Sequence, residues 1–250
     1  MEWFETIQSQ FERCFLNFRG YAVEWFETIQ SQFERCFIQD DRYMMLVKGL
    51  GVTIRVSLLA LLLGVVIGFL IALCNLSKSK ILRAIGKVYT DVIRGTPSVT
   101  QLMIIYFVIF ATVHWPKWII AAIAFGINSG AYVSEIFRAG ILSIDKGQTE
   151  AGRSLGLSSA QTMMKIVLPQ AIKNIFPTLI NEFIVLIKET AIVGYVGLMD
   201  IQKAGDFIKS ATFIAFMPLI STAIIYYVLI KILNIGLGKV EKALRKSDIR

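Results

Sequence analysis

The stretch LGVTIRVSLLALLLGVVIGFLIAL, residues 50–73, is a continuous apolar run interrupted by a single charge, Arg55. About 20 apolar residues in a helix are enough to cross the ~30 Å hydrocarbon core of a membrane. Similar runs recur along the chain, of which 55% is hydrophobic, and the mean hydropathy is +0.63. These features predict an all-α polytopic membrane protein.

The charges outside the apolar runs predict a topology. Five segments are expected to span the membrane: residues 50–73, 96–113, 118–137, 166–187 and 213–233. Residues 77–88, 138–165 and 237–250 carry thirteen Lys and Arg in total, whereas residues 114–117 and 190–212 carry three. Because Lys and Arg collect in cytoplasmic loops, the N-terminus is expected outside and the C-terminus in the cytoplasm. The same rule explains the net charge of +8 without a nucleic-acid partner.

The N-terminal region contains a duplication. Residues 2–15 and 24–37 have the same sequence, EWFETIQSQFERCF, and the apolar residues of each copy follow helical spacing. This pattern is typical of an amphipathic helix in the membrane interface. Residues 1–44 are expected to be a leader outside the core fold, which comprises residues 45–250; a leader that hangs free is the alternative. Cys14 and Cys36 are expected to be thiols, with a disulfide between them as the alternative if this segment is extracellular.

The chain lacks the patterns of common catalytic sites. It contains no GxxxxGK[ST] phosphate loop and no HExxH metal motif. Its one histidine, His114, makes no triad with the scattered serines, and its three cysteines show no metal-ligand spacing. The chain is therefore expected not to be an enzyme and to hold no metal or cofactor of its own.

Polar side chains occur inside two of the expected spans. Ionisable groups within a membrane are costly, and they commonly mark a substrate path or a buried pair. The candidates for a substrate site are Asn128, Ser129 and Glu135 in the third span and Asn181 and Glu182 in the fourth. A structural pairing of Glu182 with Lys188 or another basic group is the alternative.

The mixed segment EAGRSLGLSSAQTMMKIVLP, residues 150–169, resembles the EAA motif of ABC importer permeases. That motif reads EAA, three residues, Gly, nine residues and I-x-L-P, and only Gly152 departs from it. RGTP at residues 94–97, AYVSEIFR at 131–138 and NEF at 181–183 are similar to the polar amino-acid subfamily, the histidine, glutamine and arginine type. The resemblance covers about residues 45–250.

The resemblance implies a type I ABC importer permease in the bacterial cell membrane. A cytoplasmic coupling helix around residues 147–165 would dock into a separate ABC ATPase subunit, which holds ATP and Mg²⁺. An extracytoplasmic binding protein would deliver a polar amino acid, and a second permease copy or a paralogue would complete the assembly. The residues expected at the coupling contact are Glu150, Ala151, Gly152, Ser154, Leu155, Gly156 and Leu157.

Two other classes stay open on the residues alone. An ion-coupled secondary amino-acid transporter often shows inverted repeats, and none is visible in this sequence. A membrane anchor or scaffold would not require Asn128 and Glu182 near the membrane midplane. Uptake without any ATPase partner would favour the secondary transporter.

Overall fold

The computed structural model describes residue 25 and residues 27–246; the first copy of the duplication, with Cys14, and the last four residues lie outside that part. Every regular element of the described part is a helix, which confirms the all-α prediction. In chain order the elements are η1 (Glu34–Ile38), η2 (Gln39–Asp41), α2 (Tyr43–Leu76), α3 (Lys80–Arg94), α4 (Ser98–Ile104), η3 (Ile105–Ile109), α5 (Lys117–Leu142), α6 (Lys146–Ser154), α7 (Ser159–Thr162), η4 (Met163–Val167), α8 (Leu168–Glu189), η5 (Thr190–Val196), α9 (Ile201–Thr212) and α10 (Phe216–Lys246).

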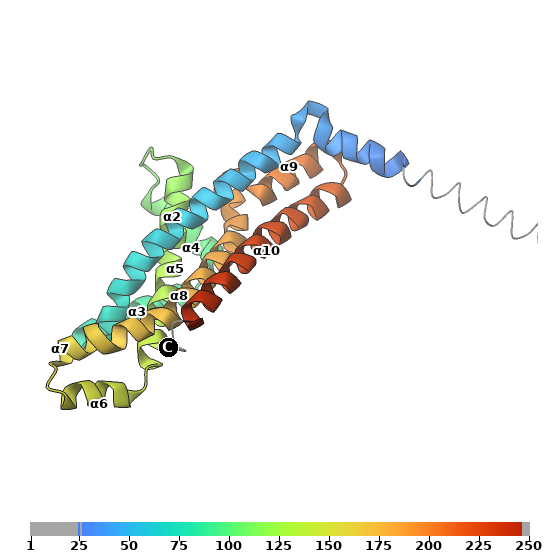
Figure 1. Ribbon diagram of the computed structural model, residues 1–250. Helices are drawn as coiled ribbons and strands as arrows, with labels where there is room; N and C mark the ends of the chain where they lie inside the picture. Colours follow the sequence, from blue (N-terminus) through green and yellow to red (C-terminus); the bar gives the residue numbers. More distant parts are fainter. Residues whose placement is uncertain (1–24, 26, 247–250) are drawn as a thin grey trace, which may run out of the picture.

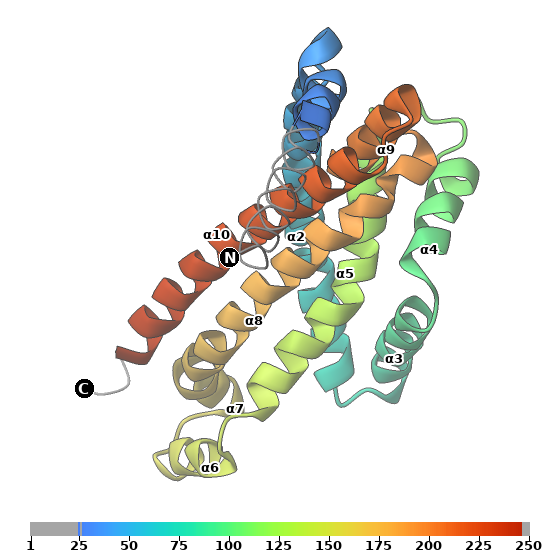
Figure 2. The same cartoon turned by 90° about the vertical axis from the view of Figure 1, so that its right-hand side faces the viewer.

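The long helices form an elongated bundle. α5 packs between α2 and α8, and α10 lies along α8 (Figure 1). The short helices α6 and α7 project at one end of the bundle, and α9 lies at the opposite end (Figure 2). The segment that joins α5 to α8 therefore lies at one end of the molecule. The segment that joins α8 to α10 lies at the opposite end.

Glycines allow α2 and α5 to approach closely. A Cβ atom added to Gly68 would lie 2.6 Å from Cγ1 of Val133, and one added to Gly130 would lie 2.7 Å from Cγ2 of Ile67. Such short distances leave no room for a side chain in a packed interior. A Cβ on Gly64 would likewise lie 3.0 Å from Cβ of Ser129. Gly64 and Gly68 thus allow a close helix contact, which positions the part of α5 that carries the candidate substrate residues.

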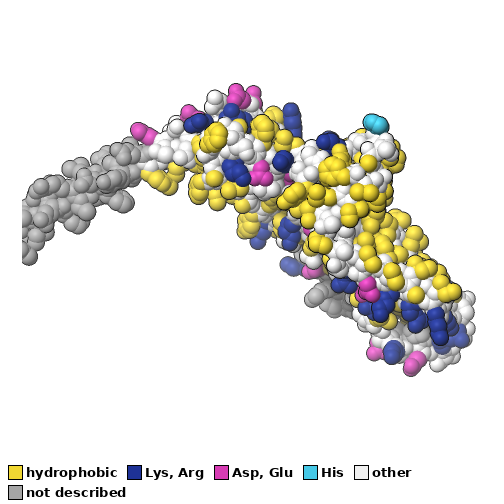
Figure 3. All heavy atoms as spheres, turned by 180° about the vertical axis from the view of Figure 1, so that it is seen from behind, with side chains coloured by type: hydrophobic (Ala, Val, Ile, Leu, Met, Phe, Trp, Pro, Cys, Tyr) yellow, Lys and Arg dark blue, Asp and Glu magenta, His cyan; other side chains and the backbone are white. Residues whose placement is uncertain are grey.

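Three described helices are long and apolar enough to cross a membrane: α2, α5 and α10. The pair α3 and α4–η3, bent by 104°, adds a fourth if it forms one span. α8 is not among them, because Lys173, Glu182, Lys188 and Glu189 lower its hydropathy. Figure 3 shows apolar side chains along the middle of the molecule and Lys and Arg gathered toward the end that carries α6 and α7. The five-span count stays a prediction.

The second expected span differs in its boundaries. Residues 77–88 are expected to be a loop, but α3 is helical from Lys80 to Arg94. The apolar residues Ile81, Leu82, Ile85 and Val88 are interleaved with cations along it, so it is amphipathic rather than apolar throughout. The chain bends between α3 and α4 because Pro97, with ψ at 135°, lacks the amide hydrogen that would continue the helix.

A buried carboxylate joins α9 to α10. Asp200 is fully buried and caps α9 by accepting hydrogen bonds from the backbone N–H groups of Gln202 (3.2 Å) and Lys203 (2.9 Å). The hydroxyl of Tyr226 on α10 donates a third, at 3.1 Å. Burial raises the pKa of the Asp200 carboxyl, and these three donors oppose that rise. The α9 end therefore depends on the Tyr226 hydroxyl.

We expect Tyr226→Phe to lower the thermal stability of the detergent-purified protein by about 1–3 kcal/mol, because Asp200 loses a donor that it cannot replace from water. The measurement is the midpoint of thermal unfolding. Tyr227→Phe is the matched control, since the Tyr227 side chain is 67% exposed. Equal midpoints for the two variants would contradict the prediction.

Candidate functional site

The segment that resembles the EAA motif folds into a short helical hairpin. α6 begins at Lys146, where the carboxylate of Asp145 accepts a hydrogen bond from the N–H of Gly147. It ends at Ser154, and Gly156 follows with φ at +84°, a conformation that favours glycine. The N–H of Leu157 bonds to the carbonyl of Gly152 at 3.2 Å, which closes the C-terminal turn. The single helix expected around residues 147–165 is thus two helices, α6 and α7.

The two arms of the hairpin are held in contact at Gly152. A Cβ on Gly152 would lie 2.8 Å from Cγ2 of Thr162 and 2.8 Å from Cδ1 of Ile166. Ser158 caps α7 through a reciprocal pair of hydrogen bonds with Gln161. The departure from the motif at position 152 therefore has a physical reason: this residue is buried inside the hairpin.

The outer face of α6 is exposed. Glu150, Ala151 and Ser154 are exposed, and Leu155 is 82% exposed. Of the seven predicted coupling residues, Gly152 and Gly156 shape the hairpin, Leu157 is half-buried, and the other four face away from the protein. A large exposed leucine beside small residues and one carboxylate is a surface suited to a close protein contact.

A second candidate region is a pocket of about 490 Å³ between α5 and α8, near the α6 hairpin. We call it the inner pocket. Two of the five predicted substrate residues, Glu135 and Glu182, line it. The other lining residues are Arg94, Tyr132, Ile136, Ala139, Gly140, Ser143, Asn174 and Thr178. The pocket therefore combines carboxylates with one cation and several neutral polar groups.

The predicted substrate residues do not form one cluster. Ser129 donates a hydrogen bond to Oε1 of Glu182 at 2.8 Å, and both residues are buried. Asn128 instead donates to Oε1 of Gln101 on α4 at 2.9 Å. Asn181 is exposed and does not line the pocket. The polar part of the pocket therefore depends on Glu182, whose carboxylate is held by the hydrogen bond from Ser129.

Sequence reasoning missed Arg94 and Tyr132 as pocket residues. The Arg94 guanidinium lies over the ring of Tyr132, 5.3 Å from its centroid, a cation–π arrangement. Glu135 forms an ion pair with Arg138 at 2.7 Å. The signal for Arg94 was its position at the end of α3, directly before the bend at Pro97, where the chain turns toward α4. Arg94 therefore supplies the cation of a pocket that is also lined by the carboxylates of Glu135 and Glu182.

Comparison with known proteins identifies the family. Residues 64–246 match the family described as "Binding-protein-dependent transport system inner membrane component". The chain belongs to this family. A putative glutamine transport system permease protein GlnP of Rickettsia bellii (strain RML369-C) is 42% identical over 205 residues, 81% of this chain and 94% of that protein. The arginine transport system permease protein ArtQ of Bacillus subtilis (strain 168) is 41% identical over the same shares of the two chains.

Solved structures agree with the fold. A chain of the structure titled "Crystal structure of an amino acid ABC transporter with histidines" is 40% identical, with a TM-score of 0.77 over 83% of this chain and 98% of that chain. An inward-facing MetNI methionine ABC transporter matches with a TM-score of 0.68 at 18% identity and supports the fold alone. The predicted type I ABC permease fold, the multi-pass location in a bacterial membrane and the assignment as a non-enzymatic transport subunit are confirmed by these relatives.

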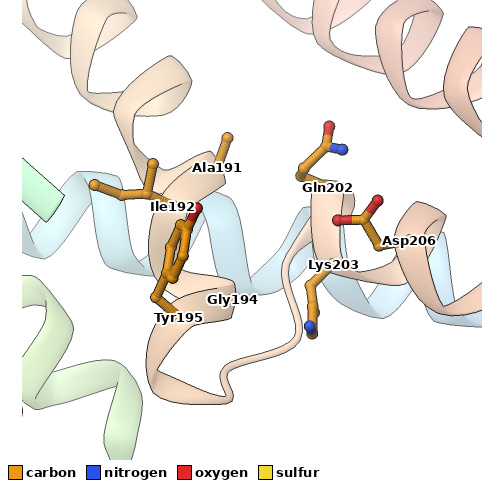
Figure 4. Close-up of a pocket in the computed structure, with 7 residues that line it drawn as sticks. All are labelled: Ala191, Ile192, Gly194, Tyr195, Gln202, Lys203 and Asp206. Atoms are coloured by element: carbon orange, nitrogen blue, oxygen red, sulfur yellow. The ribbon is translucent and has the colours of Figure 1, made fainter. Parts of the chain in front are cut away.

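The permease has another pocket, which we call the outer pocket, at the end opposite the α6 hairpin. Its volume is about 460 Å³. Figure 4 shows Tyr195 of η5 on one side and Gln202, Lys203 and Asp206 of α9 on the other. Asp206 pairs with Lys209 at 2.9 Å, and Tyr195 is 66% exposed. Polar and charged side chains line this pocket together with Ala191 and Ile192, and none of them was predicted as a site residue from the sequence.

Proposed function

We propose that this permease imports an amino acid at the expense of ATP hydrolysed by a separate subunit, and that α6 is the coupling helix. The observation that carries the proposal is the exposed face of Glu150, Ala151, Ser154 and Leu155 on a hairpin whose arms meet at Gly152 and whose turn is made at Gly156. A rigid projection transmits movement of a docked partner to the helices at its two ends. Here those helices are α5 and α8, which also line the inner pocket.

The inner pocket supports an amino acid as the substrate. Arg94 offers a cation for an α-carboxylate, and Glu182 offers an anion for an α-ammonium group. Relatives at 41–42% identity carry names for glutamine and arginine transport. A polar amino acid with neutral or cationic side chain fits both the charges and these names.

The partners follow from the two ends of the bundle. The ATPase, with its ATP and Mg²⁺, is assigned to the α6 end, which we propose to be cytoplasmic, and the N-terminus is proposed to lie outside. The binding protein is assigned to the end with η5 and α9, where Tyr195, Gln202 and Lys203 surround the outer pocket. A second permease copy or a paralogue is proposed to complete the assembly. Residues 45–250 are proposed as the transport domain and residues 1–44 as a leader, of which Cys36 and Phe37 pack into the bundle rather than lie outside the core fold.

The test is reconstitution in liposomes of this chain with its candidate ATPase and a candidate binding protein. We expect ATP-dependent uptake of labelled amino acid that requires all three proteins, and no ATPase activity from this chain alone. Uptake that persists without the ATPase and collapses with a protonophore would contradict the proposal and favour an ion-coupled secondary transporter.

A further inference from the structure

The second copy of the duplicated segment is attached to the bundle by its last two residues. Cys36 is fully buried and Phe37 is 5% exposed. They pack with Leu46 of α2 and with Ile201, Ala204 and Ile208 of α9. The Cys36 thiol lies 3.8 Å from the hydroxyl oxygen of Thr212, at the end of α9. We call this site the Cys–Phe seat.

The remainder of the second copy contributes little to this attachment. Trp25 is 67% exposed and Phe33 is 48% exposed, although both are large and apolar. Ile38, the residue directly after the copy, is 56% exposed. The side chains that the seat selects are therefore a cysteine followed by a phenylalanine.

The same pair ends the first copy. Residues 2–15 are identical to residues 24–37, so Cys14 and Phe15 correspond to Cys36 and Phe37. The next residue is Leu16 in the first copy and Ile38 in the second, a similar apolar pair. The seat has no side chain by which to distinguish the two copies.

We propose that the Cys–Phe seat is an interaction surface for either copy of the duplicated segment within one chain, and that the copies exchange in it. When Cys14 and Phe15 occupy the seat, residues 16–42 form the connection to α2; when Cys36 and Phe37 occupy it, residues 38–42 do. The two states then differ in this connection, which in the second copy folds as η2. There the Arg42 guanidinium donates a hydrogen bond to the carbonyl of Arg35 at 2.6 Å and pairs with Asp40 at 2.6 Å.

Connection length predicts the populations. The longer connection is about five times the shorter, and the cost of closing a flexible loop grows with the logarithm of its length with a coefficient of about 3/2 RT. Loop length alone favours the second copy by roughly tenfold, and the Arg42 contacts with Arg35 and Asp40 add to this preference. The second copy therefore holds the seat in most molecules, and the first copy holds it in at most about one molecule in ten.

A disulfide trap tests the exchange in the full-length protein. Cys74 is replaced by serine, and Thr212→Cys puts a thiol next to the seat. A brief oxidation pulse then links this thiol to whichever copy is seated. Trypsin separates the outcomes, because Cys14 lies in the peptide CFLNFR (residues 14–19) and Cys36 in CFIQDDR (residues 36–42). We expect the Cys36 link to dominate, with the Cys14 link at no more than about one tenth of the product.

Two matched variants shift the balance in opposite directions. Phe37→Asp in the trap protein should make the Cys14 link the major product, and Phe15→Asp should remove it. The links are counted only in protein that elutes from size exclusion like its parent. Absence of the Cys14 link in both the parent trap and Phe37→Asp would overturn the proposal. A Cys14 link that joins two chains, seen as a dimer on a non-reducing gel, would also overturn it and assign the seat to a neighbouring copy.

Discussion

The Leu155→Asp variant is expected to lose its ATPase subunit and with it nearly all ATP-driven uptake. Leu155 is 82% exposed, so the substitution leaves the interior of the hairpin unchanged. Exposed apolar anchors at the centre of a protein contact commonly cost 2 kcal/mol or more when removed, roughly a 30-fold loss of affinity. The measurement is the amount of ATPase that co-purifies with tagged permease, together with uptake in liposomes.

A matched control separates docking from general damage. Phe213 follows α9 at the opposite end of the molecule and is 92% exposed. Phe213→Asp makes the same chemical change at a site distant from α6, and it should leave the co-purified ATPase within about twofold of the wild type. If Leu155→Asp retained normal amounts of ATPase and normal uptake, α6 would not be the coupling contact.

The sequence predicted what depends on composition and spacing. Apolar runs predicted α2, α5 and α10, because a span needs only length and hydropathy. The fixed spacing of the EAA-like segment predicted a helical unit near residue 150. It did not predict the division of that unit into two arms. That division depends on Gly156 at positive φ and on the contact of Gly152 with Thr162 and Ile166, which spacing alone does not specify.

The substrate residues were harder to predict for a related reason. Hydropathy identifies a polar residue within a span but does not specify the direction of its side chain. Asn128 and Ser129 are adjacent on α5, yet Asn128 bonds to Gln101 on α4 and Ser129 to Glu182 on α8. Arg94 was missed because its pocket forms only in the folded chain. The bend after α3 and the packing of α5 and α8 bring the other lining residues next to Arg94.

Glu182→Gln is expected to lower amino-acid uptake by about 10- to 100-fold, since a hydrogen bond to a charged group contributes about 1.5–3 kcal/mol. Glutamine has the shape of glutamate, and its side-chain oxygen can still accept the hydrogen bond from Ser129, which measures 2.8 Å in the wild type. The packing of α5 against α8 is therefore retained while the negative charge is removed. The measurement is uptake of a panel of labelled amino acids by the reconstituted complex.

Two neighbouring residues provide controls for Glu182→Gln, and each control variant changes a different property of the site. Asn181→Ala removes an exposed polar group outside the pocket and should change uptake by less than about twofold. Ser129→Ala keeps the charge but removes its hydrogen-bond donor, so it should weaken uptake less than Glu182→Gln does. If Glu182→Gln transports every amino acid like the wild type while the complex assembles normally, the carboxylate only joins α8 to α5. Selectivity would then have to come from Arg94 and Glu135, the remaining charged residues of the pocket.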